Sequence, residues 1–265
     1  MEENKEENMM EPAAEQPVVV KEKKDRFLPI SILVAAILIG GAVVFSSLYK
    51  GTPTPSTAGT PTDTGNSAPT APITDATNTN VMTLGPRDAI LGNANASVTI
   101  VEYGDYQCPY CGEEFFAQTE PQIVQNYIDT GEVRMVFRNF AFLGTESTAA
   151  AEAAECAEDQ NKLWAYHDAL YTGKVADDEN GGSEDDGYFN QTLFLKLAAQ
   201  VGLNIPTFTS CIESDKYASL VAQEKTDAEA QGVNSTPTFF INGQEVLGAQ
   251  PYSAFQAVID PLLGK

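Results

Sequence analysis

The pattern of hydrophobic and polar residues predicts a mixed α/β domain in the last two thirds of the chain. The run 98–104 is rich in β-branched residues, which is typical of a buried strand, and 133–140 predicts a second strand. The stretch 109–127 between them predicts a helix, with a kink expected at Pro121. The later segments predict helices at 145–159, 162–171, 191–201, 207–232 and 252–263, and a hairpin of strands 238–243 and 244–248 that turns at Asn242-Gly243. The expected order is strand, helix, strand, a long helical block, two strands and a helix.

An apolar run without any charge occupies residues 27–49. As a helix it would be about 35 Å long, enough to cross a bilayer core of roughly 30 Å, so we expect an uncleaved transmembrane signal-anchor. One alternative is a buried core helix, but this run has no polar face. The other is a cleaved signal peptide, with a possible site at Val44-Phe45-Ser46. The run is longer than the usual apolar part of a signal peptide, which favours the anchor.

The residues on either side of this run predict its orientation. Four basic residues lie close before it, within 21–26, and only Lys50 follows closely. Because basic residues stay on the cytoplasmic side, we expect a cytoplasmic N-terminus and an extracytoplasmic C-terminal domain at the cell membrane. Residues 1–26 are polar and charged, without apolar periodicity, and predict a disordered cytoplasmic tail.

Residues 50–82 are rich in threonine and proline and contain no aromatic residue. Such a segment buries too little apolar surface to offset the entropy lost on ordering. We therefore expect a disordered linker between the membrane span and a globular domain at 83–265.

Composition excludes several functions for this domain. The chain has a formal net charge of −22, which disfavours nucleic-acid binding through a basic face. Four cysteines and one histidine are too few for an array of zinc sites or for a disulfide-dense scaffold. The acidic stretch 177–187 is expected to be a solvated surface loop, with calcium binding as the alternative.

The candidate chemistry lies in the C-P-Y-C motif at residues 108–111, directly after the first predicted strand. The first N–H groups of a helix have no partner within the helix, so they stabilise an anion placed there, in this case the thiolate of Cys108. Pro109 suits the first helical turn because its missing N–H costs nothing there. Cys111 lies one turn further on, close enough to attack a mixed disulfide at Cys108. The motif therefore predicts a thiol–disulfide exchange centre.

Two structural explanations of the motif compete with this one. A zinc site needs two more ligands, and the chain offers only Cys156, Cys211 and His167, without a second metal-binding spacing. A purely structural disulfide between Cys108 and Cys111 would close a very short loop and constrain little. We therefore expect no metal and no cofactor, since the redox group would be the disulfide itself.

Three separated segments resemble the DsbA-like disulfide oxidoreductases of the thioredoxin-fold superfamily. They are VTIVEYGDYQCPYC, AAAEAAECAEDQNKLWAYHDALY and GVNSTPTFFINGQEVLGAQPY, in that order, and the resemblance covers about residues 84–263. It implies an α/β thioredoxin fold with an inserted helical domain at about 143–230.

The resemblance also implies roles for individual residues. Cys108 would be the exposed attacking cysteine, and Cys111 the buried resolving cysteine. Thr236 and Pro237 would form a loop facing the site, with a cis peptide before Pro237 that exposes main chain to a substrate. Thr236 would bind substrate, together with Pro109 and Tyr110 of the motif.

Glu102 lies six residues before Cys108, where the family often places a buried acid that moves protons to and from Cys111. The alternative for Glu102 is a solvent-facing strand residue. Asp105 is expected to shape the turn and to be structural. His167 lies among aromatic residues at helical spacing and is expected to be a packed histidine rather than a ligand.

Tyr110 departs from the best-known members of the family, which have histidine at this position. A tyrosine hydroxyl carries no positive charge and stabilises a neighbouring thiolate less than a protonated histidine does. We therefore expect a less oxidising disulfide than in those members.

The function expected from these residues is oxidation of cysteines in secreted or cell-envelope proteins by the Cys108–Cys111 disulfide. A membrane reoxidant protein would then take up the electrons, and the catalytic domain is expected to be monomeric. The alternatives are a reductase or isomerase that uses the same centre, and a non-catalytic chaperone-like binding module.

Cys156 and Cys211 are the cysteines outside the motif. If Cys108 and Cys111 form one exchange pair, a structural disulfide between Cys156 and Cys211 is the remaining pairing. Two separate buried thiols are the alternative.

Overall fold

The computed structural model describes residues 73–74 and 81–265. The predicted tail at 1–26 and the predicted span at 27–49 lie outside these residues, as does most of the predicted linker at 50–82. In the part of the chain that is described, no helix is long and apolar enough to cross a membrane.

Six strands form one mixed sheet in the order β1-β6-β5-β3-β4-β2. The central pair, β3 and β4, is parallel, and every other neighbouring pair is antiparallel. The strands are β1 (Ile73–Thr74), β2 (Ile90–Gly92), β3 (Val98–Gly104), β4 (Val133–Asn139), β5 (Thr238–Ile241) and β6 (Gln244–Leu247). All seven residues of β3 are buried, as its β-branched sequence predicts.

The hairpin between β5 and β6 turns where its sequence predicts. Asn242 and Gly243 both have positive φ, at 46° and 89°, as a two-residue hairpin turn of this kind requires.

The two strands that sequence reasoning missed are short and lie at the edges of the sheet. In β1, Ile73 pairs with Val246 and Thr74 with Glu245, so the predicted disordered linker is wrong at this point. Val81 is also fully buried. Strand β2 pairs with β4. Each short strand obtains its hydrogen bonds from a strand that is distant in sequence, and local composition carries no record of such a partner.

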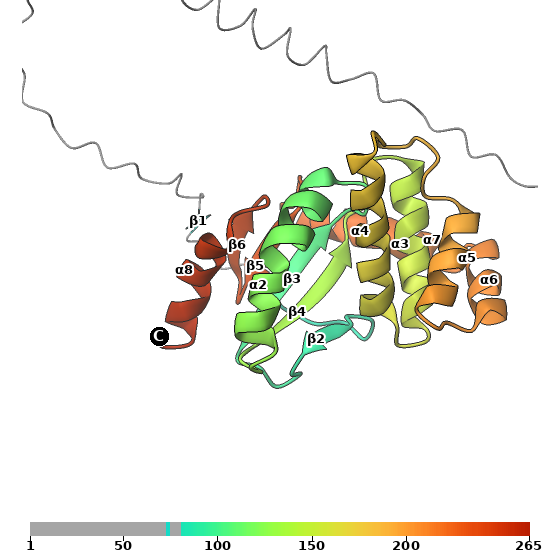
Figure 1. The fold of residues 1–265 in the computed structure, drawn as a ribbon. Helices are drawn as coiled ribbons and strands as arrows, with labels where there is room; N and C mark the ends of the chain where they lie inside the picture. The colour runs from blue at the N-terminus through green and yellow to red at the C-terminus, as the bar shows by residue number, and fades with distance from the viewer. Residues whose placement is uncertain (1–72, 75–80) are drawn as a thin grey trace, which may run out of the picture. The chain divides into compact units, whose positions relative to one another are not determined.

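Helices account for most of the remaining domain (Figure 1). A continuous helical stretch follows β3 and consists of η1 (Tyr110–Thr119), α2 (Glu120–Ile123) and η2 (Val124–Ile128). Five helices lie between β4 and β5 as the predicted insertion, and α8 closes the chain. They are α3 (Thr145–Glu158), α4 (Leu163–Glu179), α5 (Gln191–Gln200), α6 (Ile205–Glu213), α7 (Ala218–Ala230) and α8 (Tyr252–Leu262). In Figure 1 the helices α3 to α6 stand to one side of the sheet, and α8 lies near its opposite edge.

The helix after β3 is wider than a regular α-helix on both sides of Pro121. The N–H of Glu120 donates to the carbonyl of Phe115, five residues back, and Asp129 donates to Val124 in the same way at 2.8 Å. Because Pro121 has no N–H to donate, the widened hydrogen bonding lets the helix continue through it.

Two predicted helices have the wrong limits. The single helix predicted at 207–232 is two helices, α6 and α7, separated by a turn in which Asp215 has a φ of 47°. The helix predicted at 162–171 continues to Glu179, into the acidic stretch. Its extra turns contain the buried Lys174, whose Nζ binds Asp178 at 2.7 Å and Asp177 at 3.1 Å. This pairing keeps the acidic residues helical, which their charge alone does not predict.

Two main cores meet at the sheet. One packs the helix after β3 and α8 against strands β3 to β6, with Ile100, Phe115, Phe239 and Phe255 fully buried. The other fills the helical insertion and includes Cys111. The C-P-Y-C motif therefore lies where the sheet meets the inserted helices.

Candidate active site

The two motif cysteines lie at the junction between β3 and η1. The N–H of Cys108 donates to Asp105 at 3.0 Å, and the N–H groups of Cys111 and Gly112 both donate to the carbonyl of Cys108 at 3.1 Å. Both thiols are free, so the structure has the reduced form of the pair. The helix begins at the motif, as its sequence predicts.

The surroundings of the two thiols shift their pKa values in opposite directions. The hydrogen bond from the Cys111 thiol lowers the pKa of Cys108 to about 7, helped by Thr236 and by the backbone N–H groups of Cys111 and Tyr110. Complete burial raises the pKa of Cys111 well above its usual value, and the charges of Cys108 and Glu102 raise it further. Near neutral pH Cys108 is therefore about half in the thiolate form, whereas Cys111 stays a thiol.

The expected exposure of Cys108 is wrong, because this residue is only 5% exposed. Its Sγ lies 3.5 Å from the carbonyl oxygen of Thr236, so the loop before β5 covers the sulfur. The neighbouring Tyr110 is 64% exposed instead. An incoming substrate therefore meets Tyr110 and this loop before it reaches the sulfur.

The loop over Cys108 has the form that the resemblance implied. The peptide between Thr236 and Pro237 is cis. The carbonyl of Pro237 accepts a hydrogen bond from the N–H of Gly248 at 2.9 Å, which fixes the loop to the residue directly after β6. Thr236 and Cys108, 128 residues apart in sequence, are thus neighbours at the site.

Glu102 is buried beneath the motif and does not face solvent. It is 1% exposed, and in the sheet it stands opposite Phe137 on β4 and Phe239 on β5. Neither carboxylate oxygen has a hydrogen-bond partner in the described structure. Burial raises its pKa well above the usual range, and the charges of Glu120 and Cys108 add to this, so Glu102 holds a proton at neutral pH.

Asp105 has the structural role expected of it. Its carboxylate accepts hydrogen bonds from the N–H groups of Gln107, Phe142 and Leu143 at 2.9–3.1 Å, and from the Ser147 hydroxyl at 2.6 Å. These bonds fix the turn before Cys108 to the segment that enters the helical insertion.

Gln107 is a site residue that sequence reasoning missed. Its side-chain nitrogen donates to the Ser147 hydroxyl at 3.0 Å and to the Leu143 carbonyl at 3.3 Å, and its oxygen accepts from the N–H of Asp185 at 2.5 Å. The one available hint was that Gln107 directly precedes Cys108.

The acidic stretch 177–187 is exposed, as expected, but it is also anchored. Asp185 accepts from the N–H of Glu146 at 3.0 Å at the start of α3, and the Glu146 carboxylate accepts from the N–H of Phe189 at 2.6 Å. In residues 73–74 and 81–265, no group of three or more acidic, histidine or cysteine side chains is arranged to hold a metal ion. The calcium alternative therefore gains no support from this region.

His167 is a packed core residue. Its ring is fully buried, lies 4.7 Å from the Phe137 ring and 4.9 Å from the Tyr171 ring, and burial lowers its pKa to about 3. It is therefore neutral under physiological conditions.

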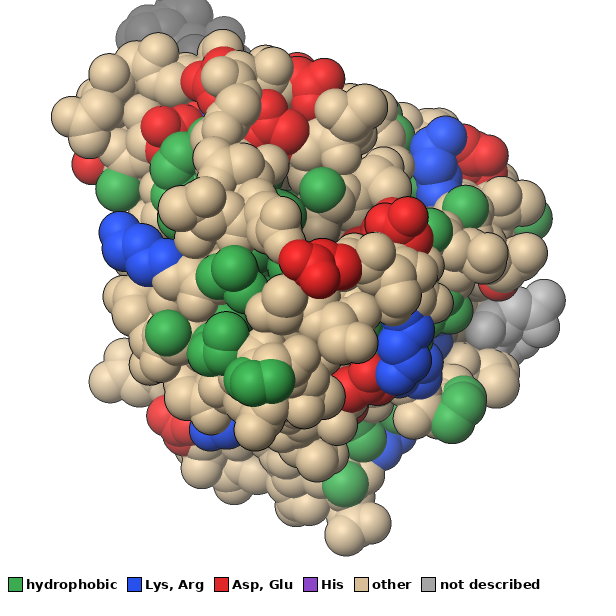
Figure 2. All heavy atoms as spheres, turned by 90° about the vertical axis from the view of Figure 1, so that its right-hand side faces the viewer, with side chains coloured by type: hydrophobic (Ala, Val, Ile, Leu, Met, Phe, Trp, Pro, Cys, Tyr) green, Lys and Arg blue, Asp and Glu red, His purple; other side chains and the backbone are tan. Residues whose placement is uncertain are grey.

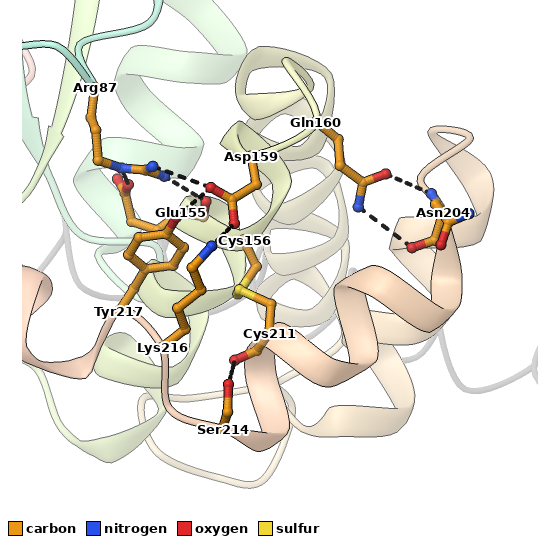
Figure 3. Close-up of a disulfide and its surroundings, with 10 residues drawn as sticks. All are labelled: Arg87, Glu155, Cys156, Asp159, Gln160, Asn204, Cys211, Ser214, Lys216 and Tyr217. Atoms are coloured by element: carbon orange, nitrogen blue, oxygen red, sulfur yellow. Dashed lines mark hydrogen bonds and ion pairs between the residues drawn. A yellow bond between two sulfur atoms is a disulfide. The ribbon is translucent and has the colours of Figure 1, made fainter.

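Cys156 on α3 and Cys211 on α6 are joined by a disulfide, the pairing that remained once the motif cysteines were set aside (Figure 3). Their Cα atoms are 5.9 Å apart, within the usual range. Beside the disulfide, Asp159 binds Lys216 at 2.5 Å and Arg87 at 3.2 Å, so ion pairs also connect α3 to the turn after α6 (Figure 3). The disulfide belongs to the helical insertion and contains neither motif cysteine.

The site combines a dithiol at a helix start, a cis-proline loop over the first sulfur and a buried acid beneath the pair. On this sheet, these features define a thiol:disulfide oxidoreductase domain of the thioredoxin class. A family model described as Thioredoxin matches residues 85–261. The chain belongs to this family.

Comparison with known proteins supports this class. Probable disulfide bond formation protein D of Bacillus anthracis is 27% identical over 179 residues, which cover 66% of this chain and 78% of that protein. The solved structure of oxidised BdbD from Bacillus subtilis has a TM-score of 0.60 and 26% identity, and covers 68% of this chain and 94% of that one. The Na(+)/H(+) antiporter NhaA 1 of Salinispora arenicola is 32% identical over 175 residues, 65% of this chain. The match spans only 24% of the antiporter's length.

Proposed function

We propose that the full chain oxidises cysteine pairs in secreted or cell-envelope proteins and then passes the electrons to a membrane reoxidant protein. The observation that carries this proposal is the difference between the two motif thiols, with a lowered pKa at Cys108 and a raised pKa at Cys111. A Cys108 with a pKa of about 7 supplies an attacking and leaving thiolate for exchange near neutral pH. Relatives named disulfide bond formation proteins support oxidation as the direction of this exchange.

The exchange proceeds in two displacements. A substrate thiolate attacks Sγ of Cys108, the bond between Cys108 and Cys111 breaks, and Cys111 takes the electron pair. Because Cys111 is fully buried, its thiolate needs a proton at once, and the proposed donor is Glu102, a buried acid whose charge is coupled to Cys111. The second substrate thiolate then attacks the substrate sulfur of the mixed disulfide, and Cys108 leaves as a thiolate.

Binding of the substrate uses the surface around the sulfur. Tyr110 offers an exposed aromatic ring, and the loop at Thr236 and Pro237 offers main-chain groups to an extended peptide. The thiol pair is the redox group, so this chemistry requires no further cofactor.

A reductase or isomerase is the second candidate for the same centre. It is favoured by one observation, the uncharged Tyr110 between the cysteines, which leaves the Cys108 thiolate with less stabilisation than a protonated histidine would give.

Incubating the oxidised full chain with a reduced two-cysteine peptide separates the two directions. An oxidant forms one peptide disulfide per chain without any added oxidant, and a reductase leaves the peptide reduced.

We also propose a location for the chain, from the sequence of its N-terminal region. We propose that residues 27–49 anchor the chain in the cell membrane as a single pass and that the monomeric catalytic domain works outside the cytoplasm. The support is the uncharged apolar run with basic residues before it. Recovery of an N-terminal tag in membranes together with the full-length chain tests the anchor, and a mature form beginning near Ser47 would contradict it.

A further inference from the structure

The side chain of Gln107, the residue directly before Cys108, is buried against the helical insertion. Gln107 is 1% exposed. Its nitrogen donates to the Leu143 carbonyl and the Ser147 hydroxyl, and its oxygen accepts from the N–H of Asp185. These three partners all lie in the segment between β4 and α5. An amide whose donor and acceptor ends both have partners keeps one orientation, so Gln107 ties its own backbone to the insertion.

The loop that carries Asp185 is itself held in place. The Asp185 carboxylate accepts from the N–H of Glu146 at 3.0 Å and from the Thr145 hydroxyl at 3.3 Å, at the start of α3. Its backbone has a φ of 56°, a left-handed conformation that few residues other than glycine adopt. The loop between α4 and α5 lies at the top of Figure 1, and acidic side chains gather at the same end of the face in Figure 2. Gln107 is therefore bonded to a segment that α3 keeps in position.

The turn before Cys108 has two attachments to the insertion. The Asp105 carboxylate accepts from the N–H groups of Phe142 and Leu143, so it fixes the beginning of the turn to the segment after β4. This attachment alone would leave the turn free to rotate about Asp105. Gln107, two residues further on, adds an attachment to a different segment, the loop after α4. Together the two attachments fix both the position and the direction of the turn.

The direction of this turn decides where the Cys108 sulfur lies. The Cys111 thiol and the backbone N–H groups of Cys111 and Tyr110 hold the pKa of Cys108 at about 7 through hydrogen bonds. Hydrogen bonds weaken steeply as they lengthen or bend. A displaced turn would therefore weaken the bonds that stabilise the thiolate.

We propose that Gln107 is a positioning residue for Cys108, which holds the attacking sulfur against the start of the motif helix. It acts through the backbone of the turn and through its bonds to the insertion. The inference rests on the proposed function for its effect on the exchange rate, whereas its effect on the Cys108 thiol is independent of that function.

The test is alkylation of Cys108 in the reduced full chain from pH 5 to pH 9, together with oxidation of a reduced two-cysteine peptide at pH 7. The titratable groups whose charges interact with this thiol are Cys111, Glu102 and Tyr171. Burial raises the pKa of each, so they keep their protons near neutral pH and the midpoint reports Cys108. In Gln107→Leu we expect the midpoint to move from near pH 7 toward pH 8. Peptide oxidation should slow by roughly tenfold, less than the roughly hundredfold that a misplacement of about 1 Å can cost.

Tyr166→Phe is the matched control. It also removes a buried hydrogen bond of the insertion, from the Tyr166 hydroxyl to the Phe194 carbonyl at 3.1 Å, but does not involve the turn. A loss of stability without a change in the alkylation midpoint is expected for this variant. Gln107→Asn is a milder second variant, since it is polar and one CH₂ shorter, and it should move the midpoint in the same direction by less.

The outcomes separate positioning from a merely structural role. Wild-type midpoints and rates in whichever Gln107 variant folds would overturn the proposal, and so would an equal shift of the midpoint in Tyr166→Phe. A shifted midpoint in a chain whose wild type does not oxidise the peptide would overturn the proposed function and leave the positioning role standing.

Discussion

Removing the Cys156–Cys211 disulfide should destabilise the domain and leave its exchange chemistry intact. The bond joins residues 55 positions apart and links α3 to α6 within the helical insertion. On the loop-entropy relation, closing a loop of this length constrains the unfolded chain by about 4 kcal/mol. For a domain of this size, that corresponds to a fall in Tm of roughly 8–16 °C.

The variant suited to this measurement is Cys156→Ala with Cys211→Ala. Both cysteines are buried, and alanine avoids placing unpaired hydroxyl groups in the core. Thermal and denaturant unfolding give the loss in free energy, and oxidation of a two-cysteine peptide at a temperature where the variant is folded gives the activity. The Asp159 ion pairs beside the bond remain in the variant, so the loss reports the disulfide itself.

Loss of exchange by the folded variant would refute this reasoning, because it would make the pair a second redox relay. Unchanged stability would refute the structural role. Mild reduction of the wild type gives an independent check, since the active pair should open before the Cys156–Cys211 bond does.

Three further predictions concern the site. Cys108→Ala should abolish exchange, and Cys111→Ala should accumulate mixed disulfides. Alkylation of the reduced wild type should occur at Cys108, with a midpoint near pH 7. Retained exchange in Cys108→Ala would contradict the assignment of Cys108 as the attacking cysteine. Glu102→Gln should raise the unfolding free energy at neutral pH. Burial raises the pKa of Glu102 in the folded chain, whereas in the unfolded chain this carboxyl ionises near pH 4.5. The wild type therefore loses stability as the pH rises above 4.5, and the glutamine variant does not. Denaturant titrations at pH 4 and pH 8 measure this, and an equal gain at both would contradict it. Gln107→Leu should lose about 1–3 kcal/mol of unfolding free energy, because it leaves the N–H of Asp185 and its other partners without their hydrogen bonds. Gln122→Leu, on the exposed side of α2, is the control and should lose little.

The sequence was sufficient for the elements that carry strong local patterns. Strand β3 has the predicted limits because seven consecutive residues suit a buried strand, and α3 begins at the predicted residue and ends within one of the predicted end. The hairpin turn was also predictable, since Asn242 and Gly243 tolerate positive φ.

The errors share a physical cause, which is dependence on distant partners. Strand β1 exists because β6 supplies its hydrogen bonds, and α4 extends because Lys174 pairs with acidic residues that look like a loop. The helices α6 and α7 were predicted as one helix because the turn between them lies in a stretch whose residues suit a helix on both sides.

The C-P-Y-C motif together with the family resemblance predicted the residues of the site more completely than their surroundings. The order of the two cysteines, the cis-proline loop and the buried Glu102 were all expected, and the structure brings them together. The burial of Cys108 under this loop was not expected, because the resemblance implied an exposed first cysteine. Gln107 carries no motif, and only the packing around it distinguishes it from a surface residue.

The reduction potential of the Cys108–Cys111 pair tests the central claim most directly. The full chain, equilibrated in glutathione buffers and quenched by alkylation, gives the fraction of reduced motif. If the chain is an oxidant, the pair should have a midpoint above roughly −230 mV, and Tyr110 should keep it below the roughly −120 mV of the strongest oxidant of this class. A midpoint near or below about −270 mV, where thioredoxin reduces its substrates, would contradict the assignment of this chain as an oxidant.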